Sequence, residues 1–255
     1  MILVEGLTLT LNGQPILKRV GLEAHPGEIT ALLGPNGSGK TTLFFCLSSH
    51  LRPQAGSISL GGRALGELSR RDLARLLATV PQEHHPVFPY SLRDLILLGR
   101  FPRVGFFGGP GPQDHDKVGE IMDLLGLTYL AEQPYTWVSG EERQLVLIGR
   151  CLAQEPRMLL LDEPTSHLDL RNQALVWGLV RRLAEEHGLT LLLTRHDANL
   201  AFHNAHRVIL LHTEGEVVAQ RPTTEVITPE AVSRLSGLEV GMLSDGQRRL
   251  LYPLS

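Results

Sequence analysis

The residues with the clearest chemical meaning lie in one short stretch that follows the spacing G-x-x-x-x-G-K-[ST] of a phosphate-binding loop. The stretch reads Gly34, Pro35, Asn36, Gly37, Ser38, Gly39, Lys40, Thr41 and Thr42. Glycine lacks a Cβ atom, so the backbone of such a loop can approach an anion closely. Lys40 offers a positive charge to the β- and γ-phosphates of a nucleotide, and Thr41 offers a hydroxyl to Mg²⁺. A glycine-rich turn without this role would rarely carry lysine and threonine in register.

A second group is the acidic pair Asp162 and Glu163, which directly follows the apolar run Leu159–Leu161. At the end of a strand, Asp162 is suited to hold Mg²⁺ through water, and Glu163 to polarise an attacking water molecule. An acidic pair after an apolar strand is common, and by itself it leaves a purely structural role equally open. Together with the phosphate loop upstream, it indicates nucleotide hydrolysis.

Buried parallel strands are the elements expected to position these residues. The apolar run Ile29–Leu33 predicts a strand just before the phosphate loop, and Thr41–Leu47 predicts a helix just after it. Met158–Leu161 is continuously apolar, as in a strand buried on both faces of a parallel sheet. Further strands are expected at Leu189–Thr194 and Arg207–His212. These segments predict an α/β fold with a P-loop NTPase core of the RecA-like type.

The N-terminal segment has the pattern of antiparallel strands. Ile2–Val4 and Leu7–Leu11 are expected as two strands joined through Gly6. Asn12-Gly13 then predicts a hairpin-type turn, and Val20–Ala24 a further strand. We therefore expect an antiparallel β subdomain attached to the core.

Between residues 83 and 155 the pattern changes to helices and irregular loops. Helices are expected at Ser91–Gly99, Asp114–Leu125 and Ser139–Leu152, the last beginning with the capping box Ser139…Glu142. We therefore predict an α-helical subdomain over 83–155, inserted into a core with its β subdomain over 1–82 and 156–255. A glycine-rich loop at Gly105–Gly111, a helix at Asn172–His187 and a hairpin built from 238–243 and 247–252 complete the prediction.

Composition narrows the classes of protein. The 24 basic and 27 acidic side chains give a net charge of −3, so no nucleic-acid partner is expected. Cys46 and Cys151 have neither disulfide nor zinc spacing, which suits a reducing compartment. No apolar run approaches the length of a membrane span, and the N-terminus lacks the features of a signal peptide. We expect a soluble chain of one or two domains.

Further motifs surround the phosphate loop and the acidic pair. They are Gln82, Val138-Ser139-Gly140-Glu141-Glu142-Arg143-Gln144, Pro164-Thr165-Ser166-His167-Leu168-Asp169 and His196. Over essentially the whole chain, the set resembles the nucleotide-binding subunit of ABC transporters. In this resemblance Gln82 matches the Q-loop, Val138–Gln144 the signature, Ser166–Asp169 the D-loop and His196 the switch histidine.

The resemblance implies a head-to-tail dimer, presumed homodimeric, that sandwiches two ATP molecules between the phosphate loop of one copy and the signature of the other. It implies catalytic roles for Glu163, His196 and Gln82, and Mg²⁺ binding by Thr41, Gln82 and Asp162. Contacts to the ATP of the second copy would come from the signature residues Ser139, Gly140, Glu141 and Glu142, and the D-loop contributes Asp169. ATP and Mg²⁺ are the implied cofactors.

By the same resemblance, ATP binding and hydrolysis close and reopen the dimer and so drive membrane-embedded permease subunits. A solute-binding protein is an indirect partner, and the chain is expected at the cytoplasmic face of the membrane. Two alternative functions are also compatible with the sequence. The chain could be a slow or regulatory nucleotide-binding subunit, or a soluble ATPase that acts on a protein assembly. The transported solute does not contact this type of subunit, so its identity is outside what the motifs imply.

Finer strings resemble the importers of iron-siderophore, heme and cobalamin type. They are Ser91-Leu92-Arg93-Asp94, Gly99-Arg100-Phe101-Pro102 and the short terminal hairpin. Phe101, Phe106 and Phe107 are candidates for an exposed apolar contact with the permease, or for loop aromatics folded back on the helices. His84-His85 and His203…His206 lack a local carboxylate or thiol that would complete a metal site, so solvated histidines are the preferred interpretation.

Two departures from the family pattern bear on turnover. Leu11 stands where the family usually has an aromatic residue that stacks on adenine, and the chain has no Phe, Tyr or Trp before Phe44. Glu141 stands where the signature normally has its second glycine. In a homodimer both departures fall on each composite site.

Overall fold

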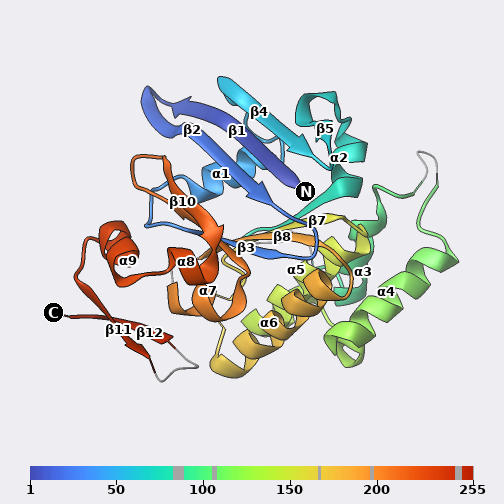
Figure 1. Ribbon diagram of the computed structural model, residues 1–255. Coiled ribbons are helices and arrows are strands. Elements are labelled where there is room, and N and C mark those ends of the chain that lie inside the picture. Colours follow the sequence, from blue (N-terminus) through green and yellow to red (C-terminus); the bar gives the residue numbers. More distant parts are fainter. Residues whose placement is uncertain (83–88, 105–107, 166–167, 196–197, 245–248, 255) are drawn as a thin grey trace. The chain divides into compact units, whose positions relative to one another are not determined.

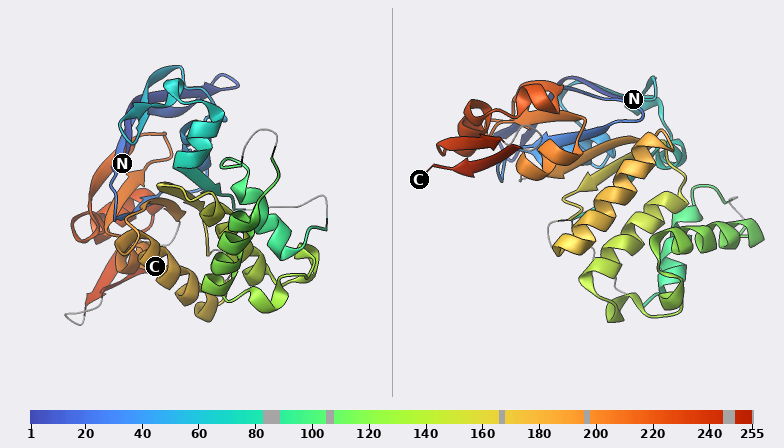
Figure 2. Two further views of the ribbon diagram at one scale, coloured as in Figure 1. Left: turned by 90° about the vertical axis from the view of Figure 1, so that its right-hand side faces the viewer. Right: turned by 60° about the horizontal axis from the view of Figure 1, so that its bottom comes forward.

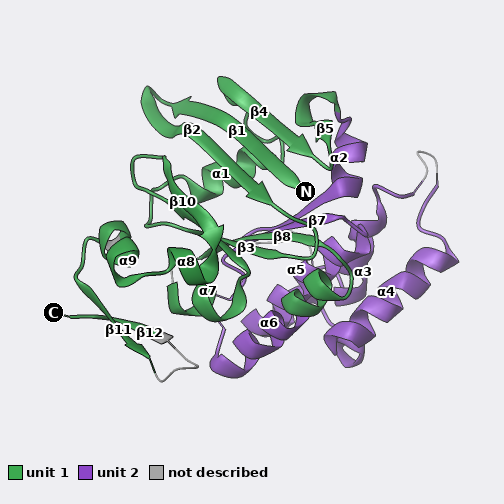
Figure 3. Cartoon of the chain, viewed as in Figure 1, with its two compact units in different colours: residues 1–67, 180–255 green, residues 68–179 purple. Residues whose placement is uncertain are grey.

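The structure is a computed structural model that describes residues 1–82, 89–104, 108–165, 168–195, 198–244 and 249–254 (Figure 1). The chain divides into two compact units, coloured separately in Figure 3. The first unit comprises residues 1–67 and 180–255, and the second residues 68–179. Helix α6 (Leu170–Glu185) contains the point at which the chain passes from the second unit back into the first.

The first unit contains most of the strands. In chain order its elements are β1 (Ile2–Leu11), β2 (Gln14–Ala24), β3 (Ile29–Leu33), α1 (Lys40–Leu47), β4 (Ala55–Leu60), β5 (Arg63–Ala64), the 3₁₀ turn η1 (Leu65–Glu67), β8 (Thr190–Arg195), α7 (Ala198–Asn204), β9 (Arg207–Leu211), β10 (Val217–Pro222), α8 (Thr223–Val226), α9 (Pro229–Ser236), β11 (Val240–Ser244) and β12 (Arg249–Pro253).

Strand β3 is the centre of the first unit. It pairs in parallel with β8 on one side and β9 on the other, and β10 extends the sheet by antiparallel pairing with β9. Every residue of β3 and of β8 is buried. Continuous burial of apolar side chains on both faces is typical of parallel strands, and it explains why these runs do not alternate in polarity.

A separate antiparallel sheet, with strand order β2-β1-β4-β5, confirms the predicted β subdomain. The structure corrects one detail, because β1 is a single strand and not two strands joined through Gly6. The register of β1 against β4 shifts between Glu5 and Thr8. This bulge adds an extra residue to β1, so the buried positions shift from Ile2 and Val4 to Leu7 and Leu9 and the same face of the strand stays buried.

Several elements of the first unit were not expected from the sequence, namely β10 and the helices α7, α8 and α9. Helix α9 does carry recognisable signals, since Thr228 caps it, Pro229 is its first residue and Gly237 ends it in the left-handed conformation. Helix α8 has only four residues, too few for a periodic pattern. The predicted terminal hairpin is present as β11 and β12.

The second unit contains the segment predicted to be helical. Its elements are α2 (Arg70–Leu76), β6 (Leu77–Val80), α3 (Leu92–Leu97), α4 (Pro112–Leu125), α5 (Gly140–Ala153), β7 (Met158–Asp162) and the short 3₁₀ turns η2 (Leu98–Arg100), η3 (Thr128–Leu130) and η4 (Tyr135–Trp137).

Helices α3, α4 and α5 pack against one another, as both views in Figure 2 show for the green and yellow-green helices. Their facing side chains are apolar and buried, among them Ile96, Met122 and Ile148. The three helices lie within the predicted helical segment 83–155. The exact limits of that subdomain stay a prediction.

A buried arginine ties the ends of these helices together. Arg100 Nε donates to Asp114 Oδ1 at 2.7 Å, and its Nη1 donates to the carbonyl of Ala153 at 2.8 Å and to Glu155 Oε2 at 2.9 Å. The hydrogen bond from Arg100 is the largest cause of the lowered pKa of the Asp114 carboxyl. Because Asp114 lies in the first turn of α4 and Ala153 is the last residue of α5, one side chain fixes both helices.

The two cysteines allow a test of this packing. Burial raises the pKa of the Cys46 thiol to about 11 and that of the Cys151 thiol to about 12. Since the thiolate is the reactive form, iodoacetamide at pH 8 should modify neither cysteine in the native protein and both in guanidinium chloride. Mass spectrometry counts the added groups. Rapid native labelling of one site would show that α1 or α5 opens readily.

Candidate functional site

The predicted phosphate loop, Gly34–Thr42, joins the carboxyl end of β3 to helix α1 in the first unit. Strand β8 ends beside it, because Leu33 pairs with Arg195. Ligands of α/β folds bind at the carboxyl ends of parallel strands. The loop therefore occupies the edge of the sheet at which a ligand is expected.

Lys40 is the buried cation of this loop. Only 6% of the residue is exposed, and its Nζ donates to the carbonyl oxygens of Gly34 at 2.7 Å and Pro35 at 3.0 Å. A buried ammonium group is costly unless it is hydrogen-bonded. The loop thus folds around Lys40 and keeps its charge next to the loop backbone.

Close packing explains two of the loop glycines. A Cβ atom on Gly34 would lie 2.5 Å from the Leu211 carbonyl oxygen and 2.6 Å from Ser38 Oγ. Gly39 has a φ angle of 99° and its Cβ would lie 2.9 Å from Leu17 Cδ2. At both positions a larger residue would push the loop away from its neighbours, so the narrow turn depends on glycine.

The donor groups of the loop fit a phosphate. Ser38 is buried, and its Oγ has no hydrogen-bond partner within the described ranges of the chain. Gly39 precedes the first turn of α1, whose free amides form the positive end of a helix dipole. A lysine ammonium, a hydroxyl and helix-end amides are together complementary to a multiply charged anion. The exposed Thr41 follows Lys40 on α1, and its hydroxyl is of the kind that can bind Mg²⁺.

The acidic pair lies in the second unit, where β6 and β7 run parallel with Val80 opposite Leu161. This register brings the residues that follow the two strands to the same edge. As a result Gln82 Nε2 donates to Glu163 Oε2 at 3.5 Å. Gln82 and Glu163 belong to separate sequence motifs, and the pairing of β6 with β7 makes them neighbours in space.

Asp162 and Glu163 occupy different environments. Asp162 is the last residue of β7 and is buried, whereas Glu163 is partly exposed. Glu163 has a φ angle of 48°, in the left-handed region that non-glycine residues rarely adopt. Strained backbone of this kind is often found at functional sites. The strand end thus carries one buried and one partly exposed carboxylate on consecutive residues, a combination that suits a Mg²⁺ ligand and a base.

The expected D-loop and switch residues are described only in part. Ser166, His167 and His196 lie outside the described residues. Asp169 Oδ1 accepts a hydrogen bond from the Asn172 amide at 2.8 Å, so this carboxylate caps the start of α6. Its family role towards a second copy stays a prediction.

The signature residues form the N-terminus of α5. Ser139 caps the helix by accepting from the Glu142 amide at 3.2 Å, and Glu142 Oε2 accepts from the Ser139 amide at 2.7 Å. The predicted capping box is confirmed. That second hydrogen bond is the largest cause of the lowered pKa of Glu142, whose Oε1 also accepts from the Tyr129 hydroxyl at 3.1 Å. Ser139 and Gly140 are exposed, so a rigid helix end faces outward.

Glu141 is partly exposed in the first turn of α5. It has no ion-pair partner among the residues that the structure describes. Arg143, the nearest basic residue in the chain, donates to the Thr136 carbonyl at 2.9 Å and lies 5.8 Å above the Tyr135 ring. These contacts direct the Arg143 guanidinium to Thr136 and Tyr135, and no ion pair between it and Glu141 is formed in the described part of the chain.

Sequence reasoning missed two exposed aromatic residues close to the signature. Trp137 and Tyr129 are 79% and 75% exposed. Trp137 precedes Ser139 by two positions, and Tyr129 contacts Glu142. The only available signal was an aromatic residue just before a helix start. Of the three phenylalanines expected in a docking patch, Phe101 is 56% exposed, and Phe106 and Phe107 lie outside the described residues.

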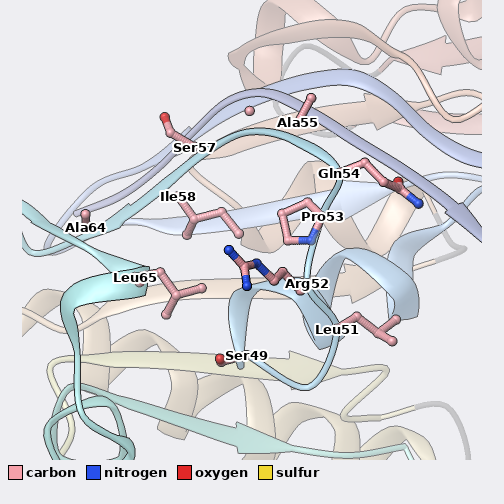
Figure 4. A pocket seen from close by; sticks show the side chains of 12 residues that line it. Ser49, Leu51, Arg52, Pro53, Gln54, Ala55, Ser57, Ile58, Ala64 and Leu65 are labelled. Atoms are coloured by element: carbon pink, nitrogen blue, oxygen red, sulfur yellow. The ribbon is translucent and has the colours of Figure 1, made fainter.

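A pocket of about 610 Å³ lies elsewhere in the first unit, between residues 49–58 and 64–66 (Figure 4). The Arg52 and Leu65 side chains point into it in Figure 4. It shares no residue with the predicted site. A nucleotide loop binds through backbone amides at an edge and does not need a deep cavity, so this pocket does not compete with Gly34–Thr42.

Two further observations concern other predicted features. His206 Nδ1 accepts from the Ile29 amide at 3.0 Å, so this histidine has a structural role at the start of β3. None of the helices in the described part of the chain is long and apolar enough to cross a membrane.

Comparison with known proteins places these features in a family. Residues 17–166 match the family model described as ABC transporter. The hemin import ATP-binding protein HmuV of Escherichia coli O157:H7 is 37% identical over 251 residues, covering 96% of this chain and 95% of the relative. The iron(3+)-hydroxamate import ATP-binding protein FhuC of Bacillus subtilis (strain 168) is 33% identical over 241 residues, covering 94% and 89%.

Comparison with solved structures identifies the same family. An inward-facing metal-chelate type ABC transporter has a chain that matches with a TM-score of 0.86 and 30% identity, covering 100% of this chain and 97% of that chain. A dimeric, post-hydrolysis bacterial cassette bound to ADP and Pi matches with a TM-score of 0.74 and 26% identity, covering 88% and 99%. These matches confirm the predicted fold class. The chain belongs to the ABC transporter family, as one of its ATP-binding, ATP-hydrolysing components.

Proposed function

We propose that this chain is the ATP-hydrolysing motor subunit of an importer for a metal chelate of the iron-siderophore, heme or cobalamin type. The observation that carries the proposal is the buried Lys40 ammonium, enclosed by the loop Gly34–Thr42 at the carboxyl end of β3. The names of the relatives, hemin and iron(3+)-hydroxamate import proteins, support the substrate class.

In this proposal the loop binds the triphosphate of ATP. Amides at the start of α1, the Ser38 hydroxyl and the Lys40 ammonium donate to the phosphate oxygens. Thr41, Gln82 and Asp162 hold Mg²⁺, which suits the oxygen ligands that they offer. Bound Mg²⁺ would neutralise charge on the β- and γ-phosphates.

Glu163 is the proposed base for hydrolysis. Its carboxylate accepts from the Gln82 amide group, which leaves further lone pairs to orient an attacking water molecule. Gln82 thereby links the proposed base to the proposed Mg²⁺ site. His196 is assigned to the γ-phosphate by family resemblance, since a neutral or charged imidazole can donate to its oxygens.

A second copy of the chain is the proposed partner in hydrolysis. The exposed helix end formed by Ser139, Gly140, Glu141 and Glu142 would meet the γ-phosphate on the other copy, and Asp169 would lie close by. The match to a dimeric cassette bound to ADP and Pi supports a dimer. Free amides at a helix N-terminus are suited to an anion.

Permease subunits are the proposed membrane partners, with a solute-binding protein acting through them, and the chain would lie at the cytoplasmic face of the membrane. The exposed Phe101 is a candidate contact with the permease. A soluble ATPase acting on a protein assembly is the alternative. Co-purification with a membrane-spanning protein of the same operon would decide for the importer, and recovery with soluble partners alone would decide against it.

Lys40→Ala should weaken ATP binding by about 10- to 100-fold, because the phosphates lose a charge-assisted hydrogen bond. Equilibrium titration with labelled ATP measures the change. Lys117→Ala, which removes an exposed lysine paired with Glu120, is the matched control and should bind as the parent does. Unchanged affinity in Lys40→Ala would remove the assignment of the loop.

Glu163→Gln should bind ATP normally but hydrolyse it about 10²- to 10⁴-fold more slowly, because an amide cannot accept a proton from water. The protein should then accumulate as a dimer in gel filtration with ATP and Mg²⁺. Glu186→Gln, at an exposed position after α6, controls for loss of charge. Normal phosphate release by Glu163→Gln would place the catalytic carboxylate elsewhere.

Glu141→Gly should increase the ATPase rate several-fold. At about 6 Å and intermediate effective dielectric, repulsion between a carboxylate and a phosphate costs on the order of 1–3 kcal/mol. The interaction of the Glu141 carboxylate with the helix dipole stabilises the protein by only about 0.3–1 kcal/mol. Steady-state ATPase at matched salt measures the effect, and Glu141→Gln separates charge from size. If the parent, Glu141→Gly and Glu141→Gln hydrolyse ATP at equal rates, Glu141 has no influence on the site. The residue then no longer supports the alternative of a slow or regulatory subunit.

A further inference from the structure

The Trp137 side chain is exposed to solvent, although it belongs to a segment whose other apolar side chains are buried. The residue is 79% exposed, although its neighbours Tyr135 and Val138 are buried. Tryptophan carries a large apolar surface and is usually covered in a folded protein. Its exposure beside the helix end that is proposed to meet ATP makes Trp137 a candidate contact for a bound partner.

The backbone around Trp137 is held on both sides. The Tyr135 amide donates to the Tyr90 carbonyl at 2.9 Å, and the Trp137 amide donates to the Pro134 carbonyl at 2.9 Å. Arg143 donates from α5 to the Thr136 carbonyl at 2.9 Å. These bonds hold the backbone that carries Trp137 close to the capped start of α5, so the indole is attached at a defined point beside the helix-end amides.

The strands that precede the phosphate loop carry no aromatic residue on which the base of ATP could stack. Leu11 ends β1 opposite Gln14, and the sequence has no aromatic residue before Phe44. A leucine offers dispersion contacts but no π face on which a purine can stack. The segment before the loop therefore offers the base apolar contacts but no aromatic ring.

The start of α5 could contact the phosphates of a nucleotide, and Trp137 lies close enough in the chain to contact its base. Ser139 and Gly140 present donors to phosphates, and Trp137 precedes Ser139 by two residues, a span of at most about 7 Å of chain. The indole is therefore displaced from the phosphate-facing amides, as a base is displaced from its phosphates. Both features are exposed and belong to the same unit.

We infer that Trp137 of one copy stacks on the adenine of the ATP held by the phosphate loop of a second copy, and so supplies the aromatic surface that Leu11 does not. This inference rests on the proposed dimeric function. It makes closure of the dimer depend on the base as well as on the phosphates. Tyr129 is the less suitable residue, because its hydroxyl is engaged by Glu142.

The first test uses the Glu163→Gln protein, in which ATP-driven dimers should accumulate. Adding Trp137→Ala should raise the ATP concentration needed for half-maximal dimerisation by about tenfold, within the range of base stacking on aromatic residues. Trp137→Phe should restore most of the effect because it keeps a π face. Tyr129→Ala removes an equally exposed aromatic ring and should shift the midpoint much less.

ATP binding to the monomer, measured at low protein concentration, should be the same with Trp137 and with Trp137→Ala. Loss of binding in both proteins would overturn the proposed function itself. Normal binding with equal dimerisation midpoints would overturn only the role of Trp137. A thermal unfolding curve for each variant shows that the exposed substitution leaves the fold intact.

The second test detects the base directly. The fluorescent analogue 1,N6-ethenoadenosine triphosphate should be quenched when the Glu163→Gln dimer forms, and Trp137→Ala should remove this quenching at saturating nucleotide. The chain has only one other tryptophan, Trp177, which is 7% exposed. In a Trp177→Phe background, Trp137 emission should change on ATP-driven dimerisation and not on ADP binding to the monomer. Equal analogue quenching with and without the indole would mean that the ring contacts a different partner.

Discussion

Burial of β3 between two parallel neighbours is the constraint on which the phosphate loop depends. Since β8 and β9 pair along both sides of β3, the chain leaves this strand only at its carboxyl edge and must turn there sharply. Lys40 stabilises the turn by donating to the Gly34 and Pro35 carbonyls. The same ammonium group is the cation that a triphosphate needs, so the interaction that shapes the loop also prepares its function.

Backbone pairing has the same effect in the second unit. The register of β6 on β7 brings Gln82 to Glu163, and the capping box fixes Ser139 and Glu142 at the start of α5. Arg100 holds the other end of α5 through the Ala153 carbonyl. Gln82 and Glu163 therefore lie directly beyond the ends of paired strands, and the signature residues lie at the start of a helix. Precise placement on such elements is what phosphoryl transfer requires of a protein.

The departures at Leu11 and Glu141 bear on the same step, which is closure of the dimer around ATP. At the position expected to face the base, Leu11 would offer no aromatic ring within one copy. Glu141 adds a negative charge at a helix end proposed to meet phosphate. Trp137 acts in the opposite direction if it covers the base from the second copy. The sum of these three effects would set the rates of dimer closure and ATP turnover. It would not alter the fold, because all three residues are at least partly exposed.

Local chemistry determined much of this protein. Apolar runs predicted β3, β7, β8 and β9, and glycine, lysine and capping signals predicted the phosphate loop and α5, because each rests on neighbouring residues. Long-range pairing decided the rest. The bulge in β1, the contact of Gln82 with Glu163 and the clamp of Arg100 join residues far apart in the chain. The exposure of Trp137 also depended on tertiary packing, since an indole in a sequence carries no sign of whether other elements will cover it.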